Sequence, residues 1–255
     1  MRTIFVGIFL LFYWLLSLPM FLIGYILGKI DPPRKHRFSQ PFVAWGFRVI
    51  LWISGIRVTI RGQENILSGE SALYVFNHRS FFDIIVGYMT APVPSAYVSK
   101  KEIAKVPLVS RWMKYMNCLF LDRDDMKQGL KTILAGIELL KNGTSIYIAP
   151  EGTRNSGEGL LPFHEASFKL ADKSKRPIIP VALNNTDEAF EKHLPWIHST
   201  HIVIEYCEPI YMDQMERSEK KHIGETVREI LLAKTAENAA KMKSNTLQQD
   251  ANHIK

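Results

Sequence analysis

Residues 72–89 read ALYVFNHRSFFDIIVGYM, and this stretch decides the fold class. The apolar and aromatic run Ala72–Phe76 predicts a buried strand, because a short apolar run that ends at polar residues is typical of a sheet interior. After the polar turn Asn77–Asp83, the run Ile84–Met89 predicts an apolar helix. A strand that passes through a short polar turn into a helix is the building unit of an α/β domain.

The chain past residue 56 repeats this alternation of short apolar runs and helical segments. Met126–Lys141 carries an apolar stripe at helical spacing, with Asp124 and Asp125 at its start and Gly143 just beyond its end, so we predict a helix there. Six further strands are predicted from β-branched and aromatic content: Ile56–Arg61, Ser95–Val98, Cys118–Leu121, Ser145–Ala149, Ile178–Leu183 and Ile202–Tyr206. Strands separated by helices predict a layered α/β domain with a mostly parallel sheet and flanking helices.

The N-terminus is too apolar for a surface helix. No charged side chain occurs from Thr3 to Gly28, and as a helix this stretch would be about 39 Å long, against about 30 Å for the hydrocarbon core of a membrane. A buried helical hairpin broken at Pro19 is the alternative. Phe38–Ile56 carries a single charge, Arg48, and predicts a second apolar helix suited to lying in a membrane interface.

A basic hinge joins these two apolar stretches around the helix-breaking Asp31-Pro32-Pro33. Its positive side chains are Lys29, Arg34, Lys35, His36 and Arg37. Because such residues gather beside anionic cytoplasmic headgroups, we expect a membrane protein at the cytoplasmic face, in a bacterial cell membrane. The chain then divides into a two-helix membrane-anchoring element at 1–56, an α/β domain at 57–212, and a charged helix with a polar tail at 213–255, the helix fading after Lys243.

Composition narrows the classes of function. The chain has 32 Lys and Arg against 25 Asp and Glu, a net charge of +7 at pH 7, which favours an anionic partner. The positive charge concentrates beside the apolar N-terminus and no nucleic-acid-binding motif occurs, so we expect no nucleic-acid partner. Two cysteines, Cys118 and Cys207, exclude a disulfide scaffold and a cysteine-rich zinc module. His193, His198 and His201 lack acidic or cysteine ligands beside them, and we expect no metal site.

The first candidate site is the turn after the strand Ala72–Phe76. A histidine at the carboxyl end of such a strand, here His78, opens into the crevice where α/β sheets bind ligands. Asp83 could bond to its second ring nitrogen, which would fix the tautomer and stabilise the imidazolium. No nucleophilic Ser or Cys motif accompanies the pair, so it would activate a substrate hydroxyl directly. The structural alternative is that Ser80 caps the following helix and Asp83 completes a capping box.

Two more predicted strands end in charged residues. Glu151, Gly152, Thr153 and Arg154 follow the strand Ser145–Ala149, and Arg123 follows Cys118–Leu121. The guanidinium fork of Arg matches phosphate oxygens, although an acid and an Arg after a strand are usually a surface ion pair. Three strand ends that deliver a His/Asp pair, an Arg and a Glu/Arg pair within one domain indicate a site for a phosphorylated substrate.

Four blocks in this sequence resemble, in order, those of the glycerolipid acyltransferases, the family of 1-acylglycerol-3-phosphate acyltransferase. The blocks are Asn77-His78-x4-Asp83, Phe120–Arg123, Pro150–Arg154 and Ile178–Val181, and the stretch Ser99–Ile103 with Val106-Pro107 resembles the linker between the first two. The chain departs from the family pattern after Pro162-Phe163, where His164 replaces the usual basic residue and Gly. It departs again at Asn117, where a Gly is common.

The resemblance implies transfer of a fatty acyl group from a thioester to the sn-2 hydroxyl of 1-acylglycerol-3-phosphate (lysophosphatidic acid), giving phosphatidic acid. His78 would be the base and Asp83 its orienting partner. The remaining site residues would bind substrate: Arg123 and Arg154 the acceptor phosphate, with Lys100 or Lys101 as helpers, and Glu151 would position Arg154 or the glycerol hydroxyls. Gly152 and Thr153 would belong to the same substrate-binding turn, and backbone N–H groups around Gly152 could bind the developing oxyanion. The donor would be a thioester of coenzyme A or of an acyl carrier protein, with no cofactor. The resemblance also implies a membrane-embedded two-helix element.

Two alternatives stay open at this point. The acceptor could be glycerol-3-phosphate, another lysophospholipid or a lipid without phosphate, although two Arg residues at strand ends favour a phosphate. The chain could also be a non-catalytic membrane protein that holds anionic lipid through its basic hinge. The presence of both His78 and Asp83 argues against a scaffold, which needs neither a base nor its partner.

Overall fold

Seven strands form one sheet in the order β1-β7-β6-β2-β5-β3-β4 in the computed structural model, which describes residues 1–122 and 124–253, with side chains through Ser244. The strands are β1 (Arg57–Arg61), β2 (Leu73–Phe76), β3 (Ser95–Lys100), β4 (Leu119–Leu121), β5 (Ser145–Ile148), β6 (Ile178–Asn184) and β7 (His201–Tyr206). Every pairing is parallel except β6 with β7. The prediction of a mostly parallel sheet is confirmed, and each strand lies within two residues of its predicted bounds.

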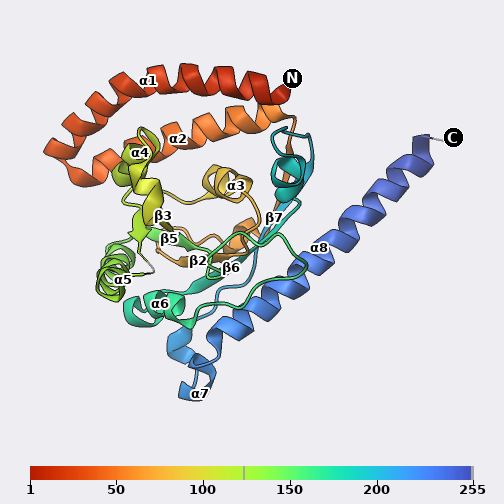
Figure 1. Cartoon of the computed structure of the whole chain (residues 1–255). Helices are drawn as coiled ribbons and strands as arrows, with labels where there is room; N and C mark the ends of the chain where they lie inside the picture. Colours follow the sequence, from red (N-terminus) through yellow and green to blue (C-terminus); the bar gives the residue numbers. More distant parts are fainter. Residues whose placement is uncertain (123, 254–255) are drawn as a thin grey trace.

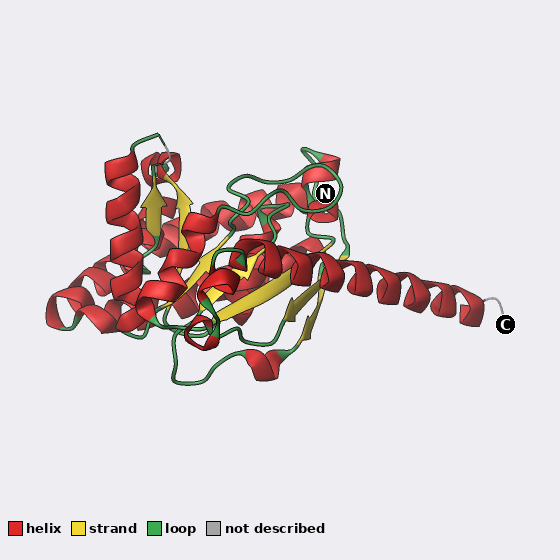
Figure 2. Ribbon diagram, turned by 90° about the horizontal axis from the view of Figure 1, so that it is seen from below, coloured by secondary structure: helices red, strands yellow, loops and turns green. Residues whose placement is uncertain are grey.

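Helices cover both faces of the sheet (Figure 1). They are α1 (Arg2–Ile30), α2 (Pro32–Ser54), α3 (Phe82–Thr90), α4 (Val109–Tyr115), α5 (Met126–Lys141), α6 (Lys169–Ser174), α7 (Arg217–Lys220) and α8 (Ile223–His253). The hairpin α1–α2 and α3 lie on one side of the sheet, and α5, α6 and α8 lie on the other (Figures 1 and 2). The predicted helix Met126–Lys141 has the observed bounds of α5.

Strand alternation separates two hydrophobic cores. On β2, Leu73 and Val75 face the core shared with α5, α6 and α8, whereas Tyr74 and Phe76 face the core shared with α1, α2 and α3. On the second face, Tyr74, Tyr147 and Tyr97 from three neighbouring strands stack with ring centroids 4.5 and 4.8 Å apart. Offset stacking of this kind adds stability beyond the buried area, and α3 packs on top of it.

The N-terminal hairpin turns at Asp31, which adopts an extended conformation between the two helices. The alternative of a break at Pro19 is wrong, because α1 continues through that residue. The predicted start of the second helix at Phe38 is also wrong: α2 begins at Pro32, so the basic hinge residues lie in its first turns. Proline is well accepted at the first position of a helix, where its missing N–H would have no partner in any case.

Close contacts fix the hairpin to the α/β domain. The indole N–H of Trp112 in α4 donates to the Ser17 hydroxyl of α1 at 3.1 Å, and the Tyr115 hydroxyl donates to the Phe21 carbonyl at 3.0 Å. A β-carbon at Gly24 would lie 2.7 Å from the Tyr115 ring, and one at Gly46 of α2 would lie 2.5 Å from the Tyr13 ring. One face of α1 is therefore closely packed against protein over most of its length.

The outer face of α1 is apolar and exposed. Its exposed side chains include Leu11, Leu15, Leu18 and Leu22. Over a window of 18 residues the mean hydropathy of α1 reaches 2.3, and within the described chain it is the one helix long and apolar enough to cross a membrane. Since α2 lies between α1 and the sheet (Figure 1), the hairpin presents this apolar face on the outside of the molecule.

The C-terminal region differs from its prediction. Instead of fading after Lys243, α8 continues to His253 and projects beyond the sheet (Figure 2). Ile223, Val227 and Leu231 anchor its first half in the core. The segment that follows Lys243 contains neither Gly nor Pro, so nothing in its composition ends the helix once the anchored half has nucleated it.

Asn77 joins β2 to β6 at the end of the sheet that carries the His78 turn, and we expect its loss to destabilise the fold. Its buried side chain donates to the Leu183 carbonyl at 2.9 Å and accepts from the Leu183 N–H at 2.8 Å. Asn77→Ala would leave two buried backbone groups without partners, at about 1–3 kcal/mol each. Chemical denaturation in detergent should show this decrease in the free energy of unfolding.

The exposed Asn142 provides the control for this measurement. Asn142→Ala should change the free energy of unfolding by no more than about 0.5 kcal/mol. Equal stabilities of the two variants would contradict the assignment of Asn77 as the link between the strands.

Candidate active site

The turns after β2 and β5 lie side by side because these strands are parallel neighbours. His78 follows β2 and Glu151 follows β5. The His78 backbone N–H donates to Glu151 Oε1 at 2.8 Å, and the Leu161 N–H donates to Glu151 Oε2 at 2.9 Å. Burial raises the pKa of the Glu151 carboxyl, while these two amide bonds act in the opposite direction. Glu151 therefore holds the histidine turn against the loop after β5.

His78 and Asp83 meet as the sequence predicted. Nδ1 of His78 lies 2.7 Å from Oδ2 of Asp83, which sits in the first turn of α3 and is buried. The same oxygen accepts from the backbone N–H groups of Arg79 at 2.7 Å and Ser80 at 2.8 Å. One carboxylate oxygen therefore both shapes the turn and orients the imidazole. The predicted cap at Ser80 is not observed as such, because α3 has Phe81 at its N-cap with no side-chain cap bond, although the Ser80 hydroxyl accepts from the Phe82 N–H at 2.9 Å.

The other ring nitrogen of His78 is available for chemistry. With Nδ1 bonded to a carboxylate, Nε2 is the atom that can accept a proton. In the part of the chain that the structure describes, Nε2 has no hydrogen-bond partner, and the His78 side chain is 22% exposed. An oriented imidazole with a free Nε2 at a sheet edge can act as a general base toward a hydroxyl group.

The sequence analysis missed Arg79 as part of this site. Its guanidinium donates to the Gly157 carbonyl at 2.8 Å and to the Gly159 carbonyl at 3.3 Å, and its Nε lies 3.2 Å from Asp187 Oδ2. Arg79 therefore connects the histidine turn to the loops after β5 and β6. The order β6-β2-β5 would have indicated such contacts, but strand order was not deducible from the individual strand patterns.

Arg154 has a different partner from the expected one. Its Nη1 lies 3.1 Å from Glu191 Oε1, and its Cζ lies 4.0 Å from the centroid of the Phe81 ring. Glu191 also accepts from the Phe81 N–H at 2.8 Å and from the Ser80 hydroxyl. We expected Glu151 to position either Arg154 or the glycerol hydroxyls of the substrate. The structure gives the contact with Arg154 to Glu191, which follows β6 and belongs to none of the motifs found in the sequence.

Gly152 and Thr153 form the turn between Glu151 and Arg154. Gly152 has a φ of +77°, a conformation that favours glycine. Its N–H donates to the Ala149 carbonyl at 3.1 Å, so this amide already has a hydrogen-bond partner within the turn. The side chain of Thr153 is exposed.

Lys100 and Lys101 lie farther along the same edge, at the end of β3, with β5 between them and the histidine turn. Lys101 Nζ pairs with Asp122 at 2.7 Å and with Asp124 at 3.4 Å. Arg123 lies outside the described residues. Among the side chains that the structure describes, those of residues 1–122 and 124–244, no group of three or more His, Cys, Asp or Glu is arranged to hold a metal ion.

Taken together, the α/β sheet and its oriented His/Asp pair define a class of enzyme that activates a hydroxyl group for group transfer. A family model described as "Acyltransferase" matches residues 57–184. The chain belongs to this acyltransferase family, whose sequence blocks it carries at His78 and at Glu151.

Several relatives match over most of the chain. The 1-acyl-sn-glycerol-3-phosphate acyltransferase of Borreliella burgdorferi is 27% identical over 73% of this chain and 75% of its own length. The enzyme of that name from Escherichia coli is 28% identical over 72% and 74%, respectively. The crystal structure of the 1-acyl-sn-glycerophosphate (LPA) acyltransferase from Thermotoga maritima has a TM-score of 0.75 at 23% identity and covers 94% of this chain and 98% of that one. This last likeness confirms the fold.

Replacing His78 should abolish acyl transfer. His78→Ala removes the base and should leave less than a tenth of the wild-type rate, with the fold intact. Asp83→Asn keeps a carbonyl oxygen for the turn but loses the charge that stabilises the imidazolium, so we expect a decrease of about 10²–10⁴ in rate. The rates are measured as thiol release from an acyl thioester.

The helix cap of α5 provides a matched Asp for comparison. Asp125 accepts from the N–H groups of Lys127 and Gln128 at the start of that helix, where Asn caps equally well. Asp125→Asn should therefore keep full activity. A His78→Ala enzyme that retained more than a tenth of the wild-type rate would exclude His78 as the general base.

Proposed function

We propose that this protein transfers a fatty acyl group from an acyl thioester to the sn-2 hydroxyl of lysophosphatidic acid, which gives phosphatidic acid. The observation that carries the proposal is the 2.7 Å contact between His78 Nδ1 and Asp83, together with a His78 Nε2 that has no hydrogen-bond partner among the described residues. The names of the Borreliella and Escherichia relatives support the same acceptor and the same reaction.

In the chemical step, His78 alone carries the proton from the acceptor hydroxyl to the departing thiolate. His78 Nε2 takes the proton of the acceptor hydroxyl as its oxygen attacks the thioester carbonyl, and Asp83 stabilises the imidazolium that forms. When the tetrahedral intermediate collapses, the carbon–sulfur bond breaks and the same proton passes to the departing thiolate. The products are the ester and a free thiol, so the thiol is a direct measure of turnover.

Arg154 is our candidate for the acceptor phosphate. Its side chain is 41% exposed, and the ion pair to Glu191 uses only Nη1, so the rest of the fork can receive phosphate oxygens. Arg123 is proposed as a second phosphate ligand, with Lys100 and Lys101 as more distant helpers. In this proposal Glu151, Gly152 and Thr153 shape the turn that carries Arg154.

The donor is proposed to be an acyl thioester of coenzyme A or of an acyl carrier protein. Assays with each donor, and with lysophosphatidic acid, glycerol-3-phosphate and other lysophospholipids as acceptors, test the assignment. Thiol release that is fastest with lysophosphatidic acid supports it. Faster release with an acceptor that lacks a phosphate monoester would contradict it.

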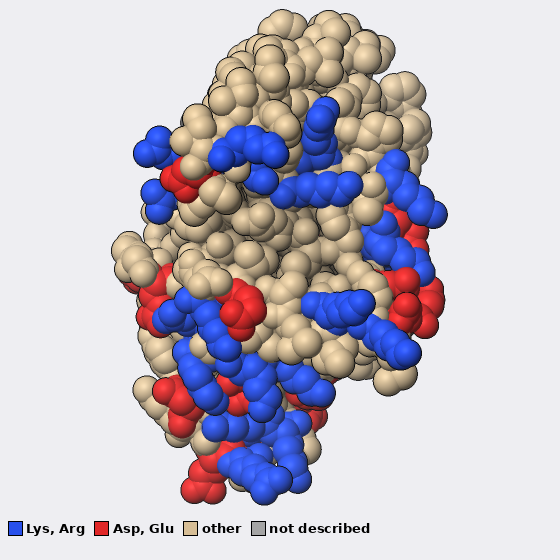
Figure 3. Space-filling view, turned by 90° about the vertical axis from the view of Figure 1, so that its left-hand side faces the viewer, with Lys and Arg blue, Asp and Glu red and all other residues tan. Residues whose placement is uncertain are grey.

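We further propose that the hairpin of residues 1–56 is embedded in one leaflet at the cytoplasmic face of a bacterial cell membrane, with the α/β domain of residues 57–212 beneath it. Several cations lie over aromatic rings of the hairpin and of α4: Lys29 over Tyr25 at 5.6 Å, Lys35 over Tyr115 at 5.3 Å and Arg111 over Phe21 at 5.0 Å. Figure 3 shows a band of Lys and Arg directly below the apolar top of the molecule.

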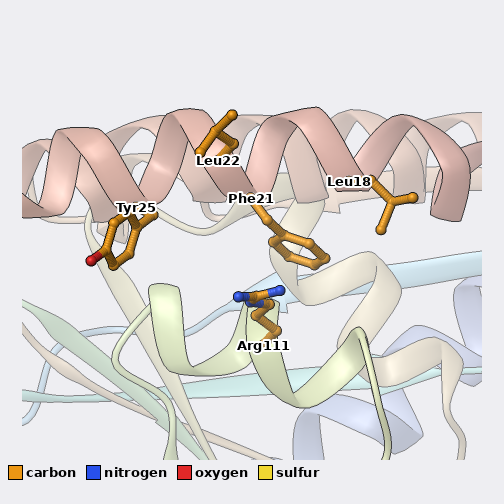
Figure 4. Close-up of a pocket in the computed structure, with 5 residues that line it drawn as sticks. All are labelled: Leu18, Phe21, Leu22, Tyr25 and Arg111. Carbon is orange, nitrogen blue, oxygen red and sulfur yellow. The ribbon is translucent and has the colours of Figure 1, made fainter.

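A groove of about 320 Å³ lies between α1 and α4, next to the Arg111 side chain. Leu18, Phe21, Leu22 and Tyr25 line it from α1, and Arg111 extends toward it from α4 (Figure 4). Apolar walls with a cation at one side suit the boundary between acyl chains and anionic headgroups.

Replacing Arg154 tests the phosphate assignment. A charge-assisted bond to phosphate contributes about 1.5–3 kcal/mol, so Arg154→Ala should raise the KM for lysophosphatidic acid about 10- to 100-fold and leave the donor KM nearly unchanged. Arg154→Lys should restore part of the affinity, because an ammonium keeps the charge but loses the fork. Steady-state kinetics with each substrate varied in turn distinguish the two KM values. A defect confined to the donor KM would refute the assignment.

The membrane proposal predicts resistance to salt. Apolar insertion is not screened by ions as surface electrostatic attraction is, so the full-length protein should stay in the membrane fraction through 1 M salt. Neutralising Arg34, Lys35 and Arg37 should weaken attraction to anionic vesicles without releasing the protein from membranes. Sedimentation after a salt wash provides the measurement, and soluble full-length protein in the absence of detergent would contradict the proposal.

A further inference from the structure

The segment Phe190–Ile197, here called the bridging loop, connects the active site to the start of α1. At one end, the Glu191 carboxylate contacts Ser80, the Phe81 N–H and Arg154. At the other end, the Ile197 N–H donates to the Thr3 hydroxyl at 2.8 Å. The loop therefore has one end at the turn that carries the base and the other at the apolar helix.

The backbone of the bridging loop is held in place between these ends. The Trp196 N–H donates to the His193 carbonyl at 2.7 Å, and the His198 N–H donates to the Ala189 carbonyl at 2.9 Å. The cation Lys192 of the loop pairs with Asp187 and Glu188, which lie just ahead of the loop. A fixed backbone gives the side chains of the loop definite directions.

Two bulky apolar side chains of this fixed loop face outward. Leu194 is 62% exposed and Trp196 is 54% exposed. Nearby, the exposed apolar face of α1 begins with Ile4 and Phe5, and Trp52 at the end of α2 is also exposed. Figure 1 shows the loop region between β6 and β7 directly beneath the N-terminal end of α1 and the C-terminal end of α2. The bridging loop therefore borders the end of the hairpin at which Ile4, Phe5 and Trp52 are exposed.

We propose that Leu194 and Trp196 form a second membrane contact, inserted into the same lipid leaflet as the outer face of α1. The occupant is lipid rather than a protein partner, because the patch borders the end of the hairpin that we propose to lie in lipid and contains a tryptophan, a residue enriched at membrane interfaces. This inference rests on the proposed membrane embedding of the hairpin. It places the entrance of the active site at the lipid surface, with the exposed Phe81 beside Glu191.

Site-directed labelling tests this contact on the full chain, with one native residue replaced in each variant. Both native cysteines, Cys118 and Cys207, are buried, so a single introduced cysteine can be labelled with an environment-sensitive fluorophore. Leu194→Cys reports on the bridging loop. Leu15→Cys reports on the outer face of α1, and Leu130→Cys on α5 is the control, since Leu130 is 60% exposed on the opposite side of the sheet.

Each labelled protein is reconstituted into vesicles of phosphatidylcholine and phosphatidylglycerol that contain lipids spin-labelled on the acyl chain. We expect the labels at 194 and 15 to emit at shorter wavelength and to be quenched at least twofold, whereas the label at 130 keeps its emission in water. Trp196→Cys gives a second position in the loop and should behave as Leu194→Cys does.

The outcomes separate this inference from the proposal on which it rests. Quenching at 15 together with a water-like signal at both 194 and 196 would overturn the second contact and leave the membrane hairpin standing. A water-like signal at 15 as well would overturn both. Equal quenching at 130 and 194 would also overturn it, because the signal would not be specific to the loop.

Discussion

A single carboxylate oxygen organises the functional end of this molecule. Oδ2 of Asp83 accepts from the His78 ring and from the backbone N–H groups of Arg79 and Ser80. The carboxylate lies in the first turn of α3, where the partial positive charge of a helix N-terminus stabilises an anion. The shape of the turn and the orientation of the His78 imidazole are therefore one interaction, and neither can change without the other.

The rest of the site is assembled around that turn by the order of the strands. Because β2 lies between β6 and β5, the loops after those two strands reach the histidine turn from opposite sides. Glu151 holds the His78 N–H from the β5 side, and Glu191 contacts the Phe81 N–H from the β6 side. Beneath them, the stacked rings of Tyr74, Tyr97 and Tyr147 provide a rigid floor for α3. The His78 turn is thus held by carboxylates from two neighbouring loops, which limits the motion of the imidazole.

The sequence predicted those parts of the structure that repeat a local pattern. All seven strands, the helix Met126–Lys141 and the pairing of His78 with Asp83 follow from periodicity, caps and spacing within a few residues. Glu191 could not be predicted in this way, because it lies in an irregular loop whose place in space is set by the sheet order. The extension of α8 beyond Lys243 was missed because a polar segment that contains neither Gly nor Pro gives no signal for a helix and none for its end. The start of α2 was misplaced because Pro32 and Pro33, which end one helix, also begin the next.

The packing of the hairpin has a consequence for how this protein can evolve. Gly24 and Gly46 leave room for the rings of Tyr115 and Tyr13, so the two helices and α4 are fitted to one another. Among the described residues, the opposite side of α1 is exposed and needs only to remain apolar. Two stripes of a single helix thus meet different packing constraints: a change in one requires a matching change in its partners, whereas the other can exchange Leu, Ile and Phe freely. A generic membrane helix of equal length and hydropathy would satisfy the second stripe alone and could not replace α1.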